Sequence, residues 1–192
     1  WPSLNQARIG RATAIQEIAL TFTGLVLSLF MLMHLGLLFS VLLGRTAMDT
    51  LASFLERYYL LQMGAFLLIL FFVVHVVLVA RKVPTALSKQ WAMLRHMRSM
   101  KHLDTWTWAF QVVSGIALLA LVAIHLWVIL TDLPVESAKS GERVFQVYLW
   151  FYIPLVILVE GHINVGLYRA AAKWKLLSRR LAHPILLGFT AI

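Results

Sequence analysis

The sequence predicts an all-α integral membrane protein of five transmembrane helices, the first four of which form a four-helix bundle. Hydrophobic residues make up 61% of the 192 residues and charged residues only 13%, so an ordinary water-facing surface is excluded. Four stretches are uncharged, or nearly so, over the ~20 residues that a bilayer requires. None of these stretches shows the alternating pattern of a barrel strand, which leaves helices as the way to satisfy the backbone in lipid.

These stretches define the predicted spans within a single domain, residues 1–192. The spans cover 18–43, 58–80, 105–131 and 144–168, and a fifth begins at about 181 and is cut off at 192. The first three contain no Asp, Glu, Lys or Arg, whereas the fourth contains Glu160. Pro154 predicts a bend in the fourth span because proline removes a helical hydrogen bond. The segment 44–59 is interpreted as the loop before the second span.

The basic residues fall mainly on one side of these spans. Of the 17 Lys and Arg residues, all but Arg45, Arg57, Lys139 and Arg143 lie before span one, between spans two and three, or after span four. Positive charge accumulates on the cytoplasmic side of a membrane, so we predict a cytoplasmic N-terminus. This face is expected to contact lipid head groups and to dock soluble partners. No nucleic-acid recognition module is recognisable, so nucleic acid is not a predicted partner.

Four of the seven histidines lie inside the spans, one in each: His34, His75, His125 and His162. Ionisable residues within a membrane indicate function. With a helical rise of 1.5 Å per residue, His34 and His125 fall in the outer half of the membrane and His75 and His162 in the inner half. Two layers of two imidazoles predict two haems b, each held by a pair of histidines.

Other features bear on this interpretation. The chain has no cysteine, which excludes thiolate ligands and c-type haem attachment. Zinc is disfavoured because two imidazoles fill only half of its tetrahedral shell. A membrane histidine can instead form an interhelical hydrogen bond. Gly24, Gly64 and Gly115 precede their own span's histidine by about three turns, so we expect them to leave room for the edge of the other haem.

A few charged residues near the histidines are further candidates. Glu160 lies two residues before His162, where an ionised carboxylate facing lipid costs ~2.5–3.5 kcal/mol. It is therefore expected to face the interior, to be protonated or to line a proton path, with a static hydrogen bond as the alternative. Lys173 and Arg169 at the inner mouth are expected to meet haem propionates or phospholipid. By position alone, Glu56 is an ordinary interfacial residue.

Along its whole length the chain resembles the di-haem cytochrome b membrane subunit of quinol:fumarate reductases and succinate:menaquinone reductases. The most specific match is the segment EGHINVGLYRAAAKW around His162, and the histidine pattern adds to it. The resemblance implies that His75 and His162 bind the haem proximal to the cytoplasmic subunits. It implies that His34 and His125 bind the distal haem.

The resemblance also implies roles for residues outside the ligand set. It places Trp108 and Lys173 by the proximal propionates, Tyr152 near the distal haem, Glu56 at the menaquinol oxidation site and Glu160 in a transmembrane proton pathway. One departure is visible, because Leu20 and Thr21 stand where the family can show Gln and Ser. This departure weakens the case for propionate contacts from the first helix.

The implied function is that of a membrane anchor in the bacterial cytoplasmic membrane. Menaquinol is oxidised near the outer side, and electrons pass through two b haems to iron–sulfur and flavin subunits on the cytoplasmic face. A dimer of such complexes is also implied. Two alternatives stay open: the b-type anchor of a hydrogenase or formate dehydrogenase, and a haem-free proton-coupled transporter.

Overall fold

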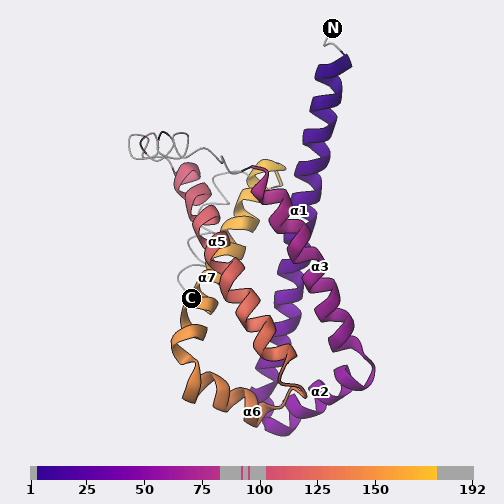
Figure 1. The fold of residues 1–192 in the computed structure, drawn as a ribbon, viewed down its shortest axis with the longest axis vertical. Coiled ribbons are helices and arrows are strands. Elements are labelled where there is room, and N and C mark those ends of the chain that lie inside the picture. The colour runs from indigo at the N-terminus through magenta and orange to yellow at the C-terminus, as the bar shows by residue number, and fades with distance from the viewer. Residues whose placement is uncertain (1–3, 83–91, 93–94, 96–102, 177–192) are drawn as a thin grey trace.

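The computed structural model describes residues 4–82, 92, 95 and 103–176, and every regular element in this part of the chain is helical (Figure 1). Four long helices dominate it: α1 (Leu4–Phe39), α3 (Leu60–Ala80), α5 (Leu103–Leu130) and α7 (Leu149–Lys173). Within the described residues, four helices are long and apolar enough to cross a membrane. The all-α, multi-pass prediction is confirmed to that extent. The fifth predicted span lies outside the described residues.

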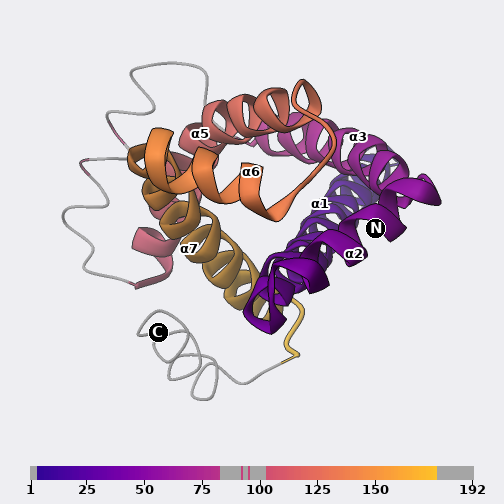
Figure 2. The same ribbon diagram turned by 90° about the horizontal axis from the view of Figure 1, so that it is seen from below.

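The long helices pack as two pairs, α1 with α3 and α5 with α7, and α1 also contacts α7 (Figure 2). Few side chains are buried between them, among them Leu118, Phe151 and Leu155. Many large apolar side chains are exposed instead, for example Phe66 and Ile116. Such a surface suits a lipid solvent, which is as apolar as leucine.

The prediction of a loop at 44–59 is wrong, because most of this segment is the helix α2 (Arg45–Arg57). Its apolar residues Met48 and Ala52 are four apart, so they share one helical face, and both are buried. Gly44 has a φ of 114°, which lets the chain turn from the preceding short 3-10 helix, Ser40–Leu43, into α2. The short helix α6 (Ser137–Glu142) lies at the same end of the molecule as α2 (Figure 1).

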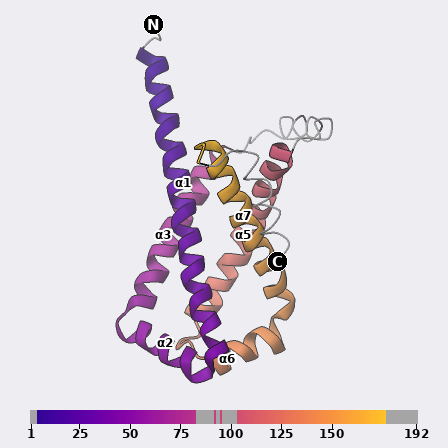
Figure 3. The same cartoon turned by 180° about the vertical axis from the view of Figure 1, so that it is seen from behind.

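Two span boundaries also differ from the prediction. The helix α1 begins at Leu4, well before residue 18, and its N-terminal part projects beyond the other helices (Figure 3). The helix α7 runs from Leu149 to Lys173 and is continuous through Pro154, whereas the prediction was 144–168. An uncharged stretch shows which residues can lie in the lipid core. The ends of the helix are set by backbone hydrogen bonding instead, so the two boundaries differ.

A π-helical turn, Arg143–Val147, precedes α7 and is tied to the end of α5. Arg143 and Lys139 both form ion pairs with Asp132, just after α5. Hydrogen bonds from these two cations hold the pKa of Asp132 below its ordinary value. The polar connection from α5 to α7 therefore has a fixed shape at the α2–α6 end.

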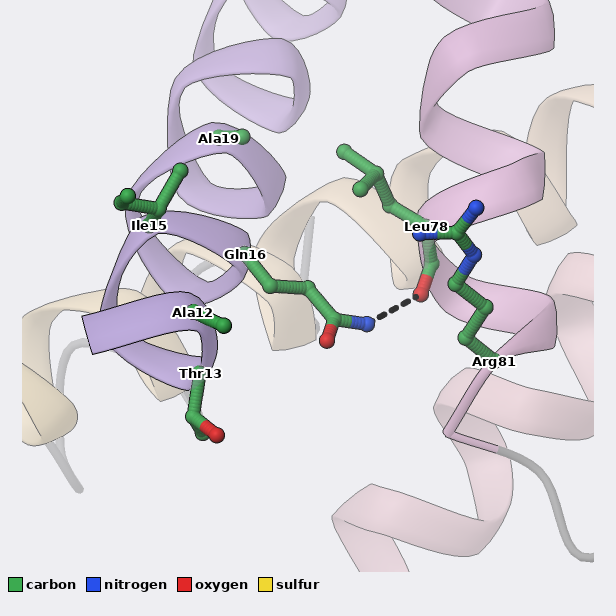
Figure 4. Close-up of a pocket in the computed structure, with 7 residues that line it drawn as sticks. All are labelled: Ala12, Thr13, Ile15, Gln16, Ala19, Leu78 and Arg81. Carbon is green, nitrogen blue, oxygen red and sulfur yellow. Dashed lines mark hydrogen bonds between the residues drawn. The ribbon is translucent and has the colours of Figure 1, made fainter. Parts of the chain in front are cut away.

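At the opposite end, a groove lies between α1 and α3 (Figure 4). Gln16 on α1 reaches across it and donates a hydrogen bond from Nε2 to the carbonyl oxygen of Leu78 at 3.3 Å. This carbonyl belongs to the last turn of α3, where carbonyl groups lack partners within the helix. The contact therefore caps α3 with a side chain from α1.

Candidate functional site

The structure brings His34 on α1 and His125 on α5 together. Their ring centroids are 6.2 Å apart, and the ring planes are inclined by 73°. Metal–imidazole bonds of about 2.0 Å to one nitrogen of each ring would place two centroids about 6 Å apart. The spacing therefore fits an iron held between the two rings. Phe30 stacks on His34 at 6.1 Å, and Tyr152 contacts His125 edge-on at 5.7 Å.

The second pair, His75 on α3 and His162 on α7, lies nearer the opposite end of the helices. Thr23 Oγ1 is 3.0 Å from His75 Nδ1, and Ser114 Oγ is 2.8 Å from His162 Nδ1. The depth argument paired the histidines in this way. The structure brings the rings of His34 and His125 together, whereas the pairing of His75 with His162 stays a prediction. Their role as haem ligands stays a prediction.

The donor set fits haem better than an ion bound by protein ligands alone. Among the described residues, no three His, Asp or Glu side chains converge on one point. A bis-histidine haem needs two imidazoles and a slot for its ring. One adjustment is required, because Gln111 Nε2 is 3.0 Å from His162 Nε2. The amide of Gln111 must turn aside for iron to bind that nitrogen.

The structure corrects what two of the glycines make room for. A Cβ atom on Gly24 would lie 3.4 Å from Cε1 of His75, and one on Gly115 would lie 3.3 Å from Cε1 of His162. Both glycines are at the expected level, but each faces an imidazole rather than open space for a haem edge. Gly64 differs, because a Cβ atom on it would lie 3.9 Å from Cε2 of Phe30.

Lys173 forms an ion pair with Glu17, a residue that the sequence did not single out. The carboxylate of Glu17 binds Lys173 through Oε2 and Lys82 through Oε1, which ties α1 to the ends of α3 and α7. Trp174 Nε1 donates to Thr21 Oγ1 at 3.0 Å, and this hydroxyl donates to the Glu17 carbonyl at 2.9 Å. Thr21 therefore has no hydroxyl proton left for a propionate. Lys173 would have to share its charge between Glu17 and a propionate.

Two carboxylates of α2 hold the segment that leads from α5 into α6. Glu56 is half-buried, and its Oε1 accepts a hydrogen bond from the backbone N–H of Val135 at 2.8 Å. Asp49 accepts from the backbone N–H of Ser137 at 2.7 Å and from its hydroxyl at 3.0 Å. Glu56 is thus an anchored side chain rather than an ordinary interfacial residue.

The remaining predicted residues, Glu160, Trp108 and Arg169, differ in how far they are exposed. Glu160 is exposed on α7, so it does not face the interior of the described helices. Its other two expected roles, as a protonated group or part of a proton path, stay predictions. Trp108 and Arg169 are half-buried on α5 and α7.

Sequence reasoning missed several residues that the structure places at these sites. They are Glu17, Thr23, Asp49, Gln111 and Ser114. One signal was available, because a hydroxyl residue followed by glycine occurs both at 23–24 and at 114–115. Each of these dipeptides ends ten residues before a membrane histidine. Asp49 and Glu56, seven residues apart, also share one face of an amphipathic helix.

Comparison with known proteins adds independent information. Residues 88–191 match the sequence profile of the succinate dehydrogenase/fumarate reductase transmembrane subunit family. Fumarate reductase cytochrome b subunits from two strains of Helicobacter pylori are 37% identical over 163 residues, which is 79% of this chain and 64% of each relative. The corresponding subunit of Wolinella succinogenes is 31% identical over 162 residues, covering 79% of this chain and 63% of the relative. This chain therefore spans less than two thirds of the length of these relatives.

Proposed function

Because this chain belongs to the succinate dehydrogenase/fumarate reductase transmembrane subunit family, we propose that it is the di-haem cytochrome b anchor of a quinol:fumarate oxidoreductase. The observation that supports haem binding most directly is the approach of His34 on α1 to His125 on α5, with 6.2 Å between their ring centroids. The second haem is proposed from His75 and His162, the histidines of the other two long helices. The fumarate reductase cytochrome b relatives support the assignment to this complex.

The test is a reduced-minus-oxidised absorption spectrum, with haem quantification, of the purified chain in its complex. Two b haems per chain are expected. A colourless protein would contradict the proposal and favour a proton-coupled transporter. Polypeptides that co-purify separate this complex from a hydrogenase or formate dehydrogenase anchor. We expect a flavoprotein and an iron–sulfur protein, since this chain has no cysteine to ligate clusters.

In the proposed arrangement, α1, α3, α5 and α7 form a four-helix bundle with a fifth helix after them. The N-terminus and the basic segments face the cytoplasm, where the partner subunits dock. His75 and His162 then form the inner pair, and His34 and His125 the outer pair. Haem bound at these pairs supplies one-electron transfer between the two faces of the membrane.

Menaquinol is proposed to bind at the outer end, beside α2. Oxidation of a quinol releases two protons, so a base at the site is required. Glu56 is the candidate, because α2 holds it at the α5–α6 connection through Val135. The hydrogen bond from the Val135 N–H fixes the position of one oxygen and leaves the other to receive a proton.

Replacing Asp49 with alanine is expected to weaken quinol binding without removing haem. The substitution deletes both hydrogen bonds to Ser137 and so loosens the segment that contacts Glu56. Hydrogen bonds to a charged group contribute ~1.5–3 kcal/mol, so we expect KM for menaquinol to rise about tenfold. Steady-state kinetics of the intact complex measure this. Asp49→Asn keeps an acceptor and should stay near the parental KM, and an unchanged KM in Asp49→Ala would refute the role.

Replacing Glu160 with glutamine is expected to slow quinol:fumarate turnover severely while both haems stay bound. Electrons moving from an outer quinol to an inner fumarate carry negative charge inward, at a cost of ~2.3 kcal/mol per charge per 100 mV. A proton that follows each electron removes this cost. Glu160 precedes His162 by two residues on α7, which is ~3 Å along the helix. In the proposed arrangement a carboxyl group therefore lies between the two histidine layers.

The Glu160 experiment uses the complex in sealed proteoliposomes with a membrane-potential dye. Fumarate reduction driven by benzyl viologen should be spared, because that donor bypasses the quinol path. Glu142→Gln, an exposed carboxylate outside the long helices, is the matched control and should behave like the parent. Parental turnover of Glu160→Gln with no potential would make Glu160 a structural residue.

A further inference from the structure

Each inner histidine contacts a buried hydroxyl group on the helix that packs beside its own. Thr23 on α1 contacts Nδ1 of His75 on α3 at 3.0 Å, and Ser114 on α5 contacts Nδ1 of His162 on α7 at 2.8 Å. The exposed fractions are only 3% for Thr23 and 1% for Ser114. Water therefore does not compete for these contacts.

The next residue in each case is the glycine that faces the same imidazole. The Cβ positions on Gly24 and Gly115 would be 3.4 and 3.3 Å from the ring carbon Cε1, the atom beside Nδ1. The dipeptides Thr23–Gly24 and Ser114–Gly115 therefore form two matching cradles. In each cradle the hydroxyl binds the ring nitrogen, and the glycine admits the adjacent ring edge.

The direction of these hydrogen bonds follows from counting protons. Ser114 Oγ donates to the Phe110 carbonyl at 2.6 Å, and Thr23 Oγ1 donates to the Leu20 carbonyl at 3.0 Å. A hydroxyl group has one proton, so an oxygen that donates it to the carbonyl accepts from the imidazole Nδ1–H. Nδ1 is therefore the protonated nitrogen, and Nε2 keeps its lone pair.

A second contact at His162 leads independently to the same tautomer. Gln111 Nε2 is an amide nitrogen, which only donates, and it lies 3.0 Å from His162 Nε2. The same amide nitrogen donates to the His162 carbonyl at 3.2 Å, which supports its orientation. His162 Nε2 therefore accepts this hydrogen bond, so its lone pair can bind a metal once the Gln111 amide turns aside.

In the outer pair, His125 has no such hydroxyl contact at Nδ1 among the described residues. Nδ1 of His125 is buried, and it has no hydrogen-bond partner within the described part of the chain. A metal-bound imidazole that donates its other N–H to an acceptor becomes more basic and stabilises the higher oxidation state. The two layers therefore differ in how strongly their imidazoles donate electrons.

We propose that Thr23 and Ser114 are positioning residues that fix the tautomer and orientation of His75 and His162 and lower the reduction potential of the inner haem. The proposal rests on the proposed function, because it requires haem at this pair. Removing either hydroxyl leaves a buried N–H without its acceptor and weakens electron donation to the iron. The inner haem should then become easier to reduce.

The test is a potentiometric titration of both haems in the purified complex, for Ser114→Ala and for Thr23→Val. The ferrous-to-ferric ratio of the inner haem at fixed ambient potential should rise about tenfold, which corresponds to about 59 mV for one electron. The reduction potential of the outer haem should not change. Electron paramagnetic resonance of the ferric state should show the change in the inner haem alone.

The controls separate the hydrogen bond from general packing. Ser114→Thr and Thr23→Ser keep the hydroxyl and should restore the parental potential. Ser28→Ala is the matched control, because Ser28 bonds to the Gly24 carbonyl of its own helix. If Ser114→Ala does not assemble, Ser114→Cys keeps the volume with a weak acceptor and should shift the potential in the same direction.

Unchanged potentials in these hydroxyl-deleting variants would overturn the proposal. Equal shifts of both haems, or a matching shift in Ser28→Ala, would also overturn it. Loss of the inner haem in Ser114→Ala but not in Ser114→Thr would support it. A parental complex without b haem would instead refute the proposed function, so the two failures can be told apart.

Discussion

Replacing His75 or His162 with alanine is expected to remove the inner haem and to leave the outer haem in place. His34→Ala and His125→Ala should remove the outer haem and leave the inner haem in place. In the proposed arrangement each pair lies across two helices, as the His34–His125 contact does, so the loss of one imidazole removes half of the axial ligands from one haem only. Haem content should fall from two per chain to about one. Menaquinol-driven fumarate reduction should be abolished in all four variants, because the electron path is interrupted.

Haem quantification and low-temperature spectra of the purified complex measure this result. His96→Ala is a suitable control, because the sequence predicts that this histidine lies in a cytoplasmic segment. Loss of the same haem from the His34 and His75 variants would contradict the layering, since these two residues lie on the neighbouring helices α1 and α3. The experiment therefore tests the pairing as well as the ligand role.

Replacing Glu56 with glutamine is expected to abolish menaquinol oxidation while both haems remain. Glutamine keeps a side-chain oxygen that can accept the hydrogen bond from the Val135 N–H, so the α5–α6 connection should keep its shape. The variant loses only the ability to take a proton at this position. General-base catalysis contributes 10²–10⁴-fold, so a loss of about 10²-fold or more in turnover is expected.

Fumarate reduction driven by benzyl viologen should persist in Glu56→Gln. This activity would show that the partner subunits are intact. Glu142→Gln again serves as the matched control. Glu56→Ala removes both the base and the contact with Val135, so it should also alter binding of menaquinol. Normal menaquinol turnover in Glu56→Gln would reduce Glu56 to an anchor for the connection.

Some features of this fold could be predicted because they depend only on composition and helical rise. Uncharged stretches of sufficient length located four spans, and the 1.5 Å rise sorted the four histidines into two layers. The ends of the helices could not be predicted as well. Segments that contain charged residues continue α1 and α7 past the apolar stretches, and α2 forms where a loop was expected.

The sequence by itself determined the membrane character, the number of histidines in the long apolar helices and the position of each along its helix. Only the tertiary structure decided which side chains meet: Thr23 with His75, Ser114 with His162, Lys173 with Glu17, and Glu56 with Val135. The physical reason is that a helix surrounded by lipid is apolar around its whole circumference. Its pattern therefore does not reveal its rotation about its axis or its register against a neighbour. Those two quantities are fixed by the packing of the helices together.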